Sequence, residues 1–193
     1  MQTIDLKSKI GKVIYEEDIE KRIVISNNIW NYIGVKGVWV LLGKKLKSQY
    51  EFLNVGKSVD IGREILYDLA CFHNLSIKTE GNSNYINQFG EYCGFNCDSG
   101  WTQEYLYPNI KNEYDKISFV FIHDESDAVF EKRLAWTTKA RYWRNGKVYK
   151  TENPDNYKNN CDAYIGEGNK PLTEVKELSE IKVELAKYGF VFD

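Results

Sequence analysis

Long apolar runs are missing from this chain of 193 residues. No stretch of about 18 consecutive apolar residues occurs, and a membrane-spanning helix requires such a stretch. The first twelve residues, MQTIDLKSKIGK, lack the apolar segment of a secretory signal peptide. We therefore expect a soluble, cytoplasmic protein with no membrane partner.

Cysteine is scarce, with four residues in the chain, and paired CxxC motifs are missing. Cys71 and His73, followed by Cys93 and Cys97, have side chains of the types that bind zinc. However, Cys71 and His73 lie two residues apart on a predicted helix and therefore point in different directions. Reduced, free thiols are the preferred interpretation, because an intracellular chain seldom keeps structural disulfides. A zinc-stabilised interaction protein is the alternative.

The chain also lacks a strong overall charge, since its formal net charge is −2. This value does not suggest an indiscriminate nucleic-acid binder. Within residues 131–150, however, seven basic residues accompany one acidic residue, Glu131. Aromatic residues are interleaved with these cations, a mixture that can neutralise a nucleic-acid backbone and stack on bases. The alternative is an exposed basic helix end with half-buried aromatics. The residues predicted to bind nucleic acid are Lys57, Lys139, Arg141, Trp143, Arg144 and Lys147.

Apolar residues are plentiful, at 42% of the chain, and they define a hairpin followed by a helix. Alternating apolar positions predict strands near residues 38–42 and 52–56. The Lys-rich turn between them, residues 43–49, has side chains that can contact phosphate or simply keep a hairpin tip soluble. Apolar positions at three- and four-residue steps then predict a helix of roughly fifteen residues, capped by Ser58 and ending near Asn74.

The rest of the chain is predicted to contain one more strand and two more helices. Residues 116–123, KISFVFIH, predict a buried strand. A helix capped by Ser126 or Asp127 follows. Its sheet-facing side is predicted to carry Val129, Phe130 and Leu134, with Trp136 as a further candidate. Residues 173–187 predict a last amphipathic helix. Residues 74–114 show no sustained periodic pattern of apolar residues. They are interpreted as an insertion, since compact domains seldom hold so long a loop.

These elements predict an α+β fold with a small antiparallel three-stranded sheet flanked by helices. Residues 1–34 form an N-terminal extension packed against the core, residues 35–150 the core with its 74–114 insertion, and residues 151–193 a C-terminal extension ending in a helix. In the N-terminal extension the apolar residues are spaced nearly as they are in a helix, and a short strand is predicted near residues 22–25.

Two triplets in the hairpin carry a family resemblance. Gly37-Val38-Trp39 lies in the first strand and Asn54-Val55-Gly56 in the second. The order hairpin, helix, buried strand, helix resembles the core of the GIY-YIG nucleases, whose triplets are Gly-aliphatic-Tyr and Tyr-Ile-Gly. Both signature tyrosines are replaced here, by Trp39 and Asn54. The family's helix arginine aligns with Glu64, and Arg63 precedes it by one position.

The resemblance implies a Mg²⁺-dependent endonuclease, with Mn²⁺ as a substitute, that acts on nucleic acid and preferably on DNA. It assigns the metal to Glu131 and a further site position to Asn145, fourteen residues later. The implied catalytic residues are Glu131, Arg63, Asn54, Trp39 and Asn145. Arg63 is the phosphate clamp only if it reaches the cleft. Candidates for the water-activating group are Tyr50, Tyr67, His73 and Lys57. A non-catalytic module that binds nucleic acid or a protein partner is the alternative.

Overall fold

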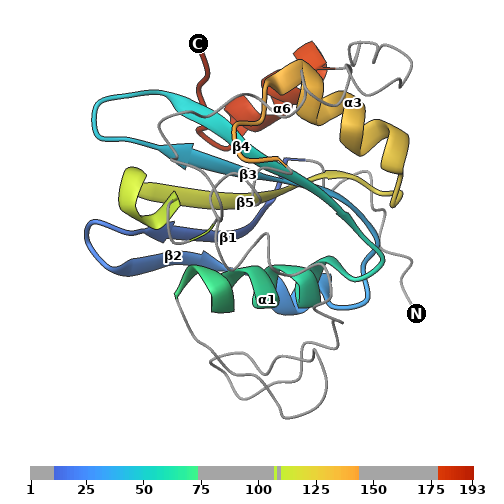
Figure 1. Cartoon of the computed structure of the whole chain (residues 1–193), viewed down its shortest axis with the longest axis horizontal. Coiled ribbons are helices and arrows are strands. Elements are labelled where there is room, and N and C mark those ends of the chain that lie inside the picture. The colour runs from blue at the N-terminus through green and yellow to red at the C-terminus, as the bar shows by residue number, and fades with distance from the viewer. Residues whose placement is uncertain (1–10, 74–106, 108–109, 144–177) are drawn as a thin grey trace, which may run out of the picture.

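A five-stranded antiparallel sheet forms the centre of the protein (Figure 1). The computed structural model describes residues 11–73, 107, 110–143 and 178–193. The strand order in the sheet is β2-β1-β5-β3-β4. The strands are β1 (Val13–Asp18), β2 (Ile23–Asn27), β3 (Gly37–Lys44), β4 (Tyr50–Ser58) and β5 (Lys116–His123). The helices are η2 (Ile29–Tyr32, a 3-10 helix), α1 (Ile61–Phe72), α3 (Ala128–Thr138) and α6 (Leu178–Lys187).

The predicted hairpin and buried strand are confirmed as β3, β4 and β5. In β3, Val38 and Val40 belong to one core cluster and Trp39 and Leu41 to the other, because successive side chains point to opposite faces of the sheet. Strand β3 lies between β4 and β5, and Gly37 at its start lies so close to β5 that a Cβ there would be 2.2 Å from a backbone oxygen. The first glycine of the triplets is therefore required by strand packing.

The prediction of a three-stranded sheet is wrong, because the N-terminal segment adds two strands. Strand β1 pairs antiparallel with β5, and β2 pairs antiparallel with β1 at the outer edge. The segment predicted as an extension packed against the core is instead part of the sheet. Among its described residues, 11–34, the predicted short strand near residues 22–25 is confirmed as β2, and the near-helical spacing forms no long helix, since only the short η2 follows β2.

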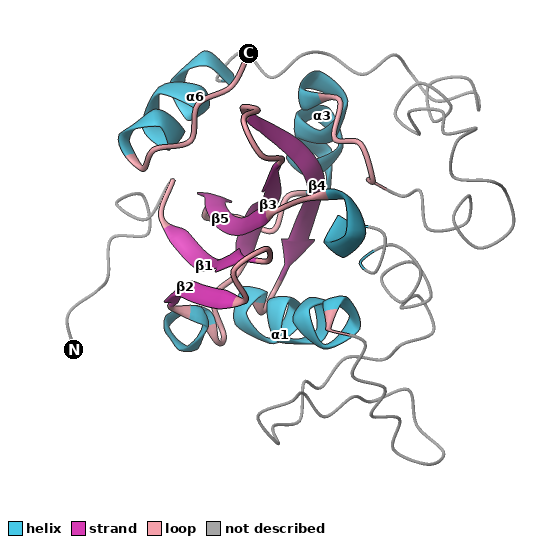
Figure 2. Cartoon of the chain, turned by 90° about the vertical axis from the view of Figure 1, so that its left-hand side faces the viewer, coloured by secondary structure: helices cyan, strands magenta, loops and turns pink. Residues whose placement is uncertain are grey.

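Helices cover both faces of the sheet (Figures 1 and 2). Helix α1 and η2 lie on one face, and α3 and α6 lie on the other. Each face has its own cluster of buried apolar side chains. The protein is thus an α+β fold with three layers, and its edge strand β4 has α1 near its end and α3 beside it.

The helix after the hairpin begins two residues later than predicted. The N-cap of α1 is Asp60, whose side chain accepts a hydrogen bond of 3.1 Å from the backbone nitrogen of Arg63. Ser58 instead accepts a bond from the nitrogen of Asp60, at 3.0 Å. The helix has 12 residues and ends at Phe72, which makes it shorter than expected.

Helix α3 is capped by Asp127, the second of the two predicted candidates. Its carboxylate accepts bonds from the backbone nitrogens of residues 129 and 130, at 2.7 and 3.2 Å. Leu134 is fully buried as predicted, whereas Val129 is 63% exposed and does not face the sheet. The helix ends at Thr138, because Lys139 adopts a left-handed conformation with φ of 53°.

The C-terminal helix was predicted over residues 173–187, and the structure describes it from Leu178. Residues 173–177 lie outside the described part of the chain, as do most of the predicted 74–114 insertion and residues 151–172. From the insertion, Tyr107, Ile110 and Tyr114 are described and belong to the core on the α1 side.

Candidate functional site: a buried acidic cluster

Three carboxylic acids gather where β4 ends and α1 begins, and we call them the acidic cluster: Glu64, Asp68 and Glu131. Glu64 and Asp68 lie one turn apart on α1 and therefore share a face of that helix. Glu131 lies in the first turn of α3 and is 7% exposed. The cluster thus joins the two helices that follow the hairpin and β5.

Glu64 is the residue that links the two helices electrostatically. The pKa of Glu64 is raised to about 7, mainly by burial of its carboxyl group and next by the nearby charge of Glu131, although the residue as a whole is partly exposed. The side chains of Ser58 and Trp39, and the charge of Lys57, act in the opposite direction. A carboxyl group that titrates near neutral pH can both accept and donate protons at physiological pH.

Asp68 is fully buried beside Glu64. The Tyr107 hydroxyl donates a 2.9 Å hydrogen bond to one carboxylate oxygen of Asp68, and Oδ1 has no hydrogen-bond partner in the described part of the chain. Burial, and next the charge of Glu64, hold the pKa of Asp68 well above its usual range, although the Tyr107 bond lowers it. Burial, and next the charge of Asp68, hold the pKa of the Tyr107 phenol well above its usual range, and the side chain of Asn54, which reaches the hydroxyl, acts in the opposite direction.

Glu131 is held in place by an indole. Trp143 is 2% exposed, and its Nε1 donates a 3.0 Å hydrogen bond to Oε1 of Glu131. A buried carboxylate requires such a donor, because an unpaired buried charge is costly. Trp143, which was predicted to stack on nucleic acid, therefore has its ring in the core and positions the acidic cluster.

Trp39 forms the wall of the cluster on the sheet side. Its ring packs at a 55° angle on Phe119, with 5.4 Å between the ring centroids. A Cβ on Gly56 would lie 2.2 Å from the indole, so only glycine fits opposite Trp39. The indole Nε1 is buried and has no hydrogen bond of normal geometry within the described residues, yet it interacts with Glu64.

Arg63 lies outside the cluster. Its side chain is 48% exposed, and Nε lies 3.4 Å from a carboxylate oxygen of Asp60. Glu64 occupies the inward position that the resemblance gives to an arginine. The cluster is therefore acidic where the implied phosphate clamp would be basic.

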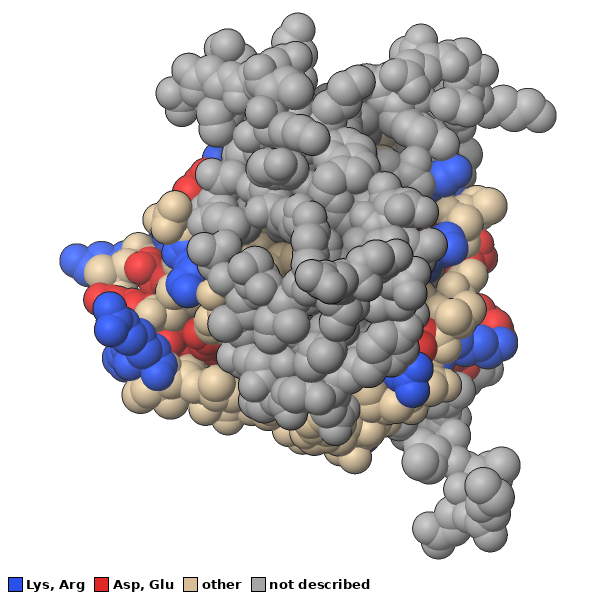
Figure 3. All heavy atoms as spheres, turned by 60° about the horizontal axis from the view of Figure 1, so that its bottom comes forward, with Lys and Arg blue, Asp and Glu red and all other residues tan. Residues whose placement is uncertain are grey.

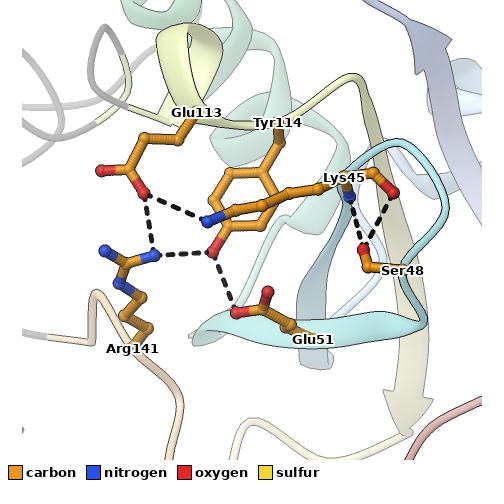
Figure 4. Close-up of polar contacts among 6 residues, drawn as sticks. All are labelled: Lys45, Ser48, Glu51, Glu113, Tyr114 and Arg141. Atoms are coloured by element: carbon orange, nitrogen blue, oxygen red, sulfur yellow. Dashed lines mark hydrogen bonds and ion pairs between the residues drawn. The ribbon is translucent and has the colours of Figure 1, made fainter.

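The other predicted nucleic-acid contacts are divided between exposed and engaged side chains. Lys57 and Lys139 are exposed. Arg141 is half-buried, and its Nη1 lies 2.8 Å from Glu113 and donates a 3.1 Å hydrogen bond to the Tyr114 hydroxyl (Figure 4). The predicted residues Arg144, Asn145 and Lys147 lie outside the described part of the chain.

The zinc alternative gains no support from the residues that the structure describes. Cys71 is a buried thiol, and Nε2 of His73 lies 3.0 Å from Oε2 of Glu17. Cys93 and Cys97 lie outside the described part of the chain. Among the described residues, no group of three or more His, Cys, Asp or Glu side chains is arranged to hold a metal ion.

The candidates for a water-activating group are not brought together at the cluster. Tyr50 packs edge-on against Phe190 at the opposite end of β4, with ring centroids 4.9 Å apart. Tyr67 is 4% exposed, and His73 is engaged with Glu17. Lys57 interacts with the acidic cluster, through Glu64.

Sequence reasoning missed Asp68 and Tyr107. The signal for Asp68 was present: two acids four residues apart on an amphipathic helix repel each other unless their surroundings compensate. Tyr107 could not be singled out, because it is one of many aromatic residues in a segment that has no periodic pattern of apolar residues.

Comparisons of the chain with protein-family models, curated proteins and solved structures found no match. Within the described residues, no helix is both long enough and apolar enough to cross a membrane.

Proposed function

We propose that this chain is a divergent GIY-YIG-like domain that binds nucleic acid, preferably DNA, and hydrolyses phosphodiester bonds at the acidic cluster with Mg²⁺. One observation carries this proposal. Glu131 on α3 interacts with Glu64 on α1 beside Trp39, so positions that the resemblance assigns to one site are brought together.

The carboxylates of the cluster are oxygen donors of the type that a hard divalent cation prefers, although the described residues do not hold three such groups in a metal-binding arrangement. Mg²⁺ is usually held by one or two carboxylates and several water molecules. Glu131 and Glu64 would supply the two carboxylates, and a cation between them would relieve their mutual repulsion. A bound Mg²⁺ or Mn²⁺ stabilises negative charge on a phosphate.

Proton transfer is the second requirement of phosphodiester hydrolysis, because the attacking water must lose a proton. A divalent cation held by Glu64 and Glu131 would lower the pKa of a bound water molecule and so supply the attacking hydroxide in place of the missing tyrosines. Trp39 has only an N–H donor and serves to shape the site.

Nucleic acid would approach along exposed cations that begin beside the cluster. Lys57 interacts with Glu64, and Lys139 lies exposed at the opposite end of α3 from Glu131. Phosphate contacts of this kind position a backbone without reading its sequence. Residues 144–150, which add further basic residues, continue the chain from there.

A non-catalytic binding module is the second candidate. Arg63 pairs with Asp60 on the solvent side, and Glu64 takes the position of the phosphate clamp. Without a cation, carboxylates at this position repel a phosphate. Under this alternative the domain binds nucleic acid through its surface cations only.

Cleavage assays separate the two candidates. Labelled double-stranded DNA, single-stranded DNA and RNA are incubated with Mg²⁺ or Mn²⁺ and with wild type, Glu131→Ala, Glu131→Gln or the surface control Glu125→Gln. Glu131→Gln keeps an oxygen that accepts the Trp143 N–H, so it tests chemistry with the least damage to packing. Cleavage by wild type and Glu125→Gln, with loss in both Glu131 variants, supports the nuclease. If the proteins bind nucleic acid and none of them cleaves it, the result supports the non-catalytic binding module.

A further inference from the structure

A hollow in the surface lies at the opposite end of β4 from the acidic cluster. The turn after β1, the turn between β3 and β4, and the first residues of β5 enclose a hollow of about 250 Å³, which we call the lysine pocket. Both hairpin turns lie on the left in Figure 1, and Figure 2 looks onto this end of the sheet. Basic and acidic side chains lie close together along the left edge of Figure 3.

Lysine dominates the lining. The five lysines of the pocket are Lys21, Lys44, Lys45, Lys47 and Lys116. Three carboxylates also line it, from Asp18, Glu20 and Asp115. Two further carboxylates, Glu16 and Glu113, lie just outside the lining and pair with Lys116 and Lys45, so the pocket and its surroundings hold five lysines and five carboxylates.

Two of these carboxylates are already engaged. Asp18 accepts a 2.9 Å bond from the backbone nitrogen of Lys21 and lies 3.3 Å from its ammonium group. The backbone bond to Lys21, and next its ammonium charge, hold the pKa of Asp18 below its usual range although burial opposes them. Asp115 accepts a bond from the backbone nitrogen of Leu46. These hydrogen bonds organise the two turns that line the pocket.

Not all the ammonium groups are matched by carboxylates. Lys116 pairs with Glu16 at 2.7 Å, and Lys45 lies 3.8 Å from Glu113. In the described part of the chain, Lys44 and Lys47 form no ion pair, although the Lys44 ammonium lies 5.4 Å from the centroid of the Tyr50 ring. Lys44 and Lys47 are thus the cations of the pocket that an incoming anion can reach.

The walls of the pocket are held together by hydrogen bonds. The backbone nitrogen of Asp115 donates to the oxygen of Lys44 at 3.0 Å, and the nitrogen of Ile19 donates to the oxygen of Asp115 at 2.7 Å. Within the β3–β4 turn, Ser48 Oγ accepts from the nitrogen of Lys45 at 3.0 Å and donates to its oxygen at 2.8 Å (Figure 4). A preformed wall lowers the entropy cost of binding a ligand.

The conformation of Lys47 adds a further reason to look for a ligand. Its φ is 64°, in the left-handed region that favours glycine or asparagine, and its side chain is exposed. A lysine held there gains nothing from packing. Strained positions of this kind occur often at ligand-binding sites.

We propose that the lysine pocket binds a phosphate group, with Lys44 and Lys47 as its principal cations. Lysine ammonium groups are common phosphate ligands, and Lys44 and Lys47 are the two lining lysines that form no ion pair with a described carboxylate. The volume is smaller than the roughly 300–1,000 Å³ of pockets for drug-sized ligands, so the ligand is a small phosphorylated molecule or one phosphate of a nucleic acid. The pocket does not depend on the acidic cluster or on the proposed cleavage.

The test is calorimetric titration of the full chain with inorganic pyrophosphate, at low ionic strength and in EDTA so that no divalent cation binds elsewhere. Lys44→Gln/Lys47→Gln is compared with wild type. Lys12→Gln/Lys36→Gln is the matched control, because it removes the same charge at the other end of the sheet. Circular dichroism checks that all three proteins are folded.

We expect wild type and the control to bind pyrophosphate alike and the pocket variant to bind at least tenfold more weakly. Lack of binding by wild type at millimolar pyrophosphate, or equal affinity of all three proteins, would overturn the proposal. A competition experiment with a short DNA identifies the source of the phosphate. Displacement of pyrophosphate by a short DNA indicates a backbone phosphate, and retention in the presence of DNA indicates a small phosphorylated molecule.

Discussion

The ionisation of Glu64 connects the site to the stability of the whole chain. The folded protein keeps this carboxyl protonated up to a pH of about 7, whereas its usual pKa is 4.5. Between these two values the unfolded chain binds fewer protons than the folded chain does. The free energy of unfolding that depends on Glu64 therefore falls as the pH rises from about 4.5 to about 7.

Glu64→Gln removes this dependence, because a glutamine stays neutral at every pH of interest. We expect the stability of the variant relative to wild type to rise with pH across that window, by at most about 3 kcal/mol. Urea unfolding of both proteins at pH 5 and pH 8 measures it. A difference between the proteins that is the same at both pH values would contradict the assignment.

Gly56 and Trp39 form a contact that leaves no space for a methyl group. Gly56→Ala would place a Cβ 2.2 Å from the indole, and overpacking of this kind costs about 1–3 kcal/mol. Urea unfolding measures the loss. In a Trp39→Leu background the same substitution should cost less, since the indole is gone. An equal cost in both backgrounds would rule out the indole as the cause.

At the scale of residues, the sequence predicted that Trp39 and Glu131 lie together, and the structure brings both of them to Glu64. The triplets and Glu131 mark the end of the hairpin, where Trp39, Glu64 and Glu131 do meet. The sequence could not decide which of Arg63 and Glu64 points inward, because a helix rotated by one residue exposes one and buries the other. Asp68 was missed because buried acids are rare and depend on partners distant in the sequence.

Among the elements, β3, β4 and β5 were predictable because their apolar patterns are strong. Strand β1 was not, because acids interrupt its alternation: VIYEED contains Glu16 and Glu17 in succession. Both are paired with residues that are distant in the sequence. Glu16 bonds to Lys116 at 2.7 Å and to Ser118 at 2.8 Å, and Glu17 contacts His73 at 3.0 Å. Pairing of this kind cannot be read from local periodicity.

Helix α3 carries Glu131 in its first turn, so the cap of this helix also supports the site. Asp127→Ala removes the acceptor for two backbone nitrogens and should cost about 1 kcal/mol. Asp127→Asn keeps a side-chain oxygen and should cost much less. Thermal unfolding of both variants measures the difference. Equal losses would mean that the cap bonds do not stabilise the helix.

At the scale of the whole molecule, the C-terminal segment closes the second face of the sheet. Phe190 is 1% exposed and packs edge-on against Tyr50, while Phe192 stacks on Phe52 with centroids 4.8 Å apart. The backbone nitrogen of Tyr50 also donates a 2.9 Å bond to the oxygen of Val191. The last residues of the chain thus stabilise the start of β4.

Phe190→Ala should lower the free energy of unfolding by about 3–5 kcal/mol, because it leaves a cavity between α6 and the sheet. Val191→Ala is the matched control, since Val191 is 56% exposed and its substitution should change stability by about 0.5 kcal/mol or less. Urea unfolding measures both. Similar losses in the two variants would mean that the C-terminal segment does not pack as described.

The two ends of the sheet have opposite chemistry, with the acidic cluster at the end of β4 and the lysine pocket at its start. This arrangement arises from contacts between distant segments, so composition alone could not predict it. The net charge of −2 reveals neither feature.

The most direct test of a cation site at the acidic cluster is a count of bound Mn²⁺ by electron paramagnetic resonance, at pH 7.5 and without nucleic acid. Wild type should bind one Mn²⁺ per chain, Mg²⁺ should displace it, and Glu131→Gln and Glu64→Gln should each weaken binding at least tenfold. Wild-type binding that both variants retain at full strength, or no binding by wild type at millimolar Mn²⁺, would contradict a metal-dependent site there.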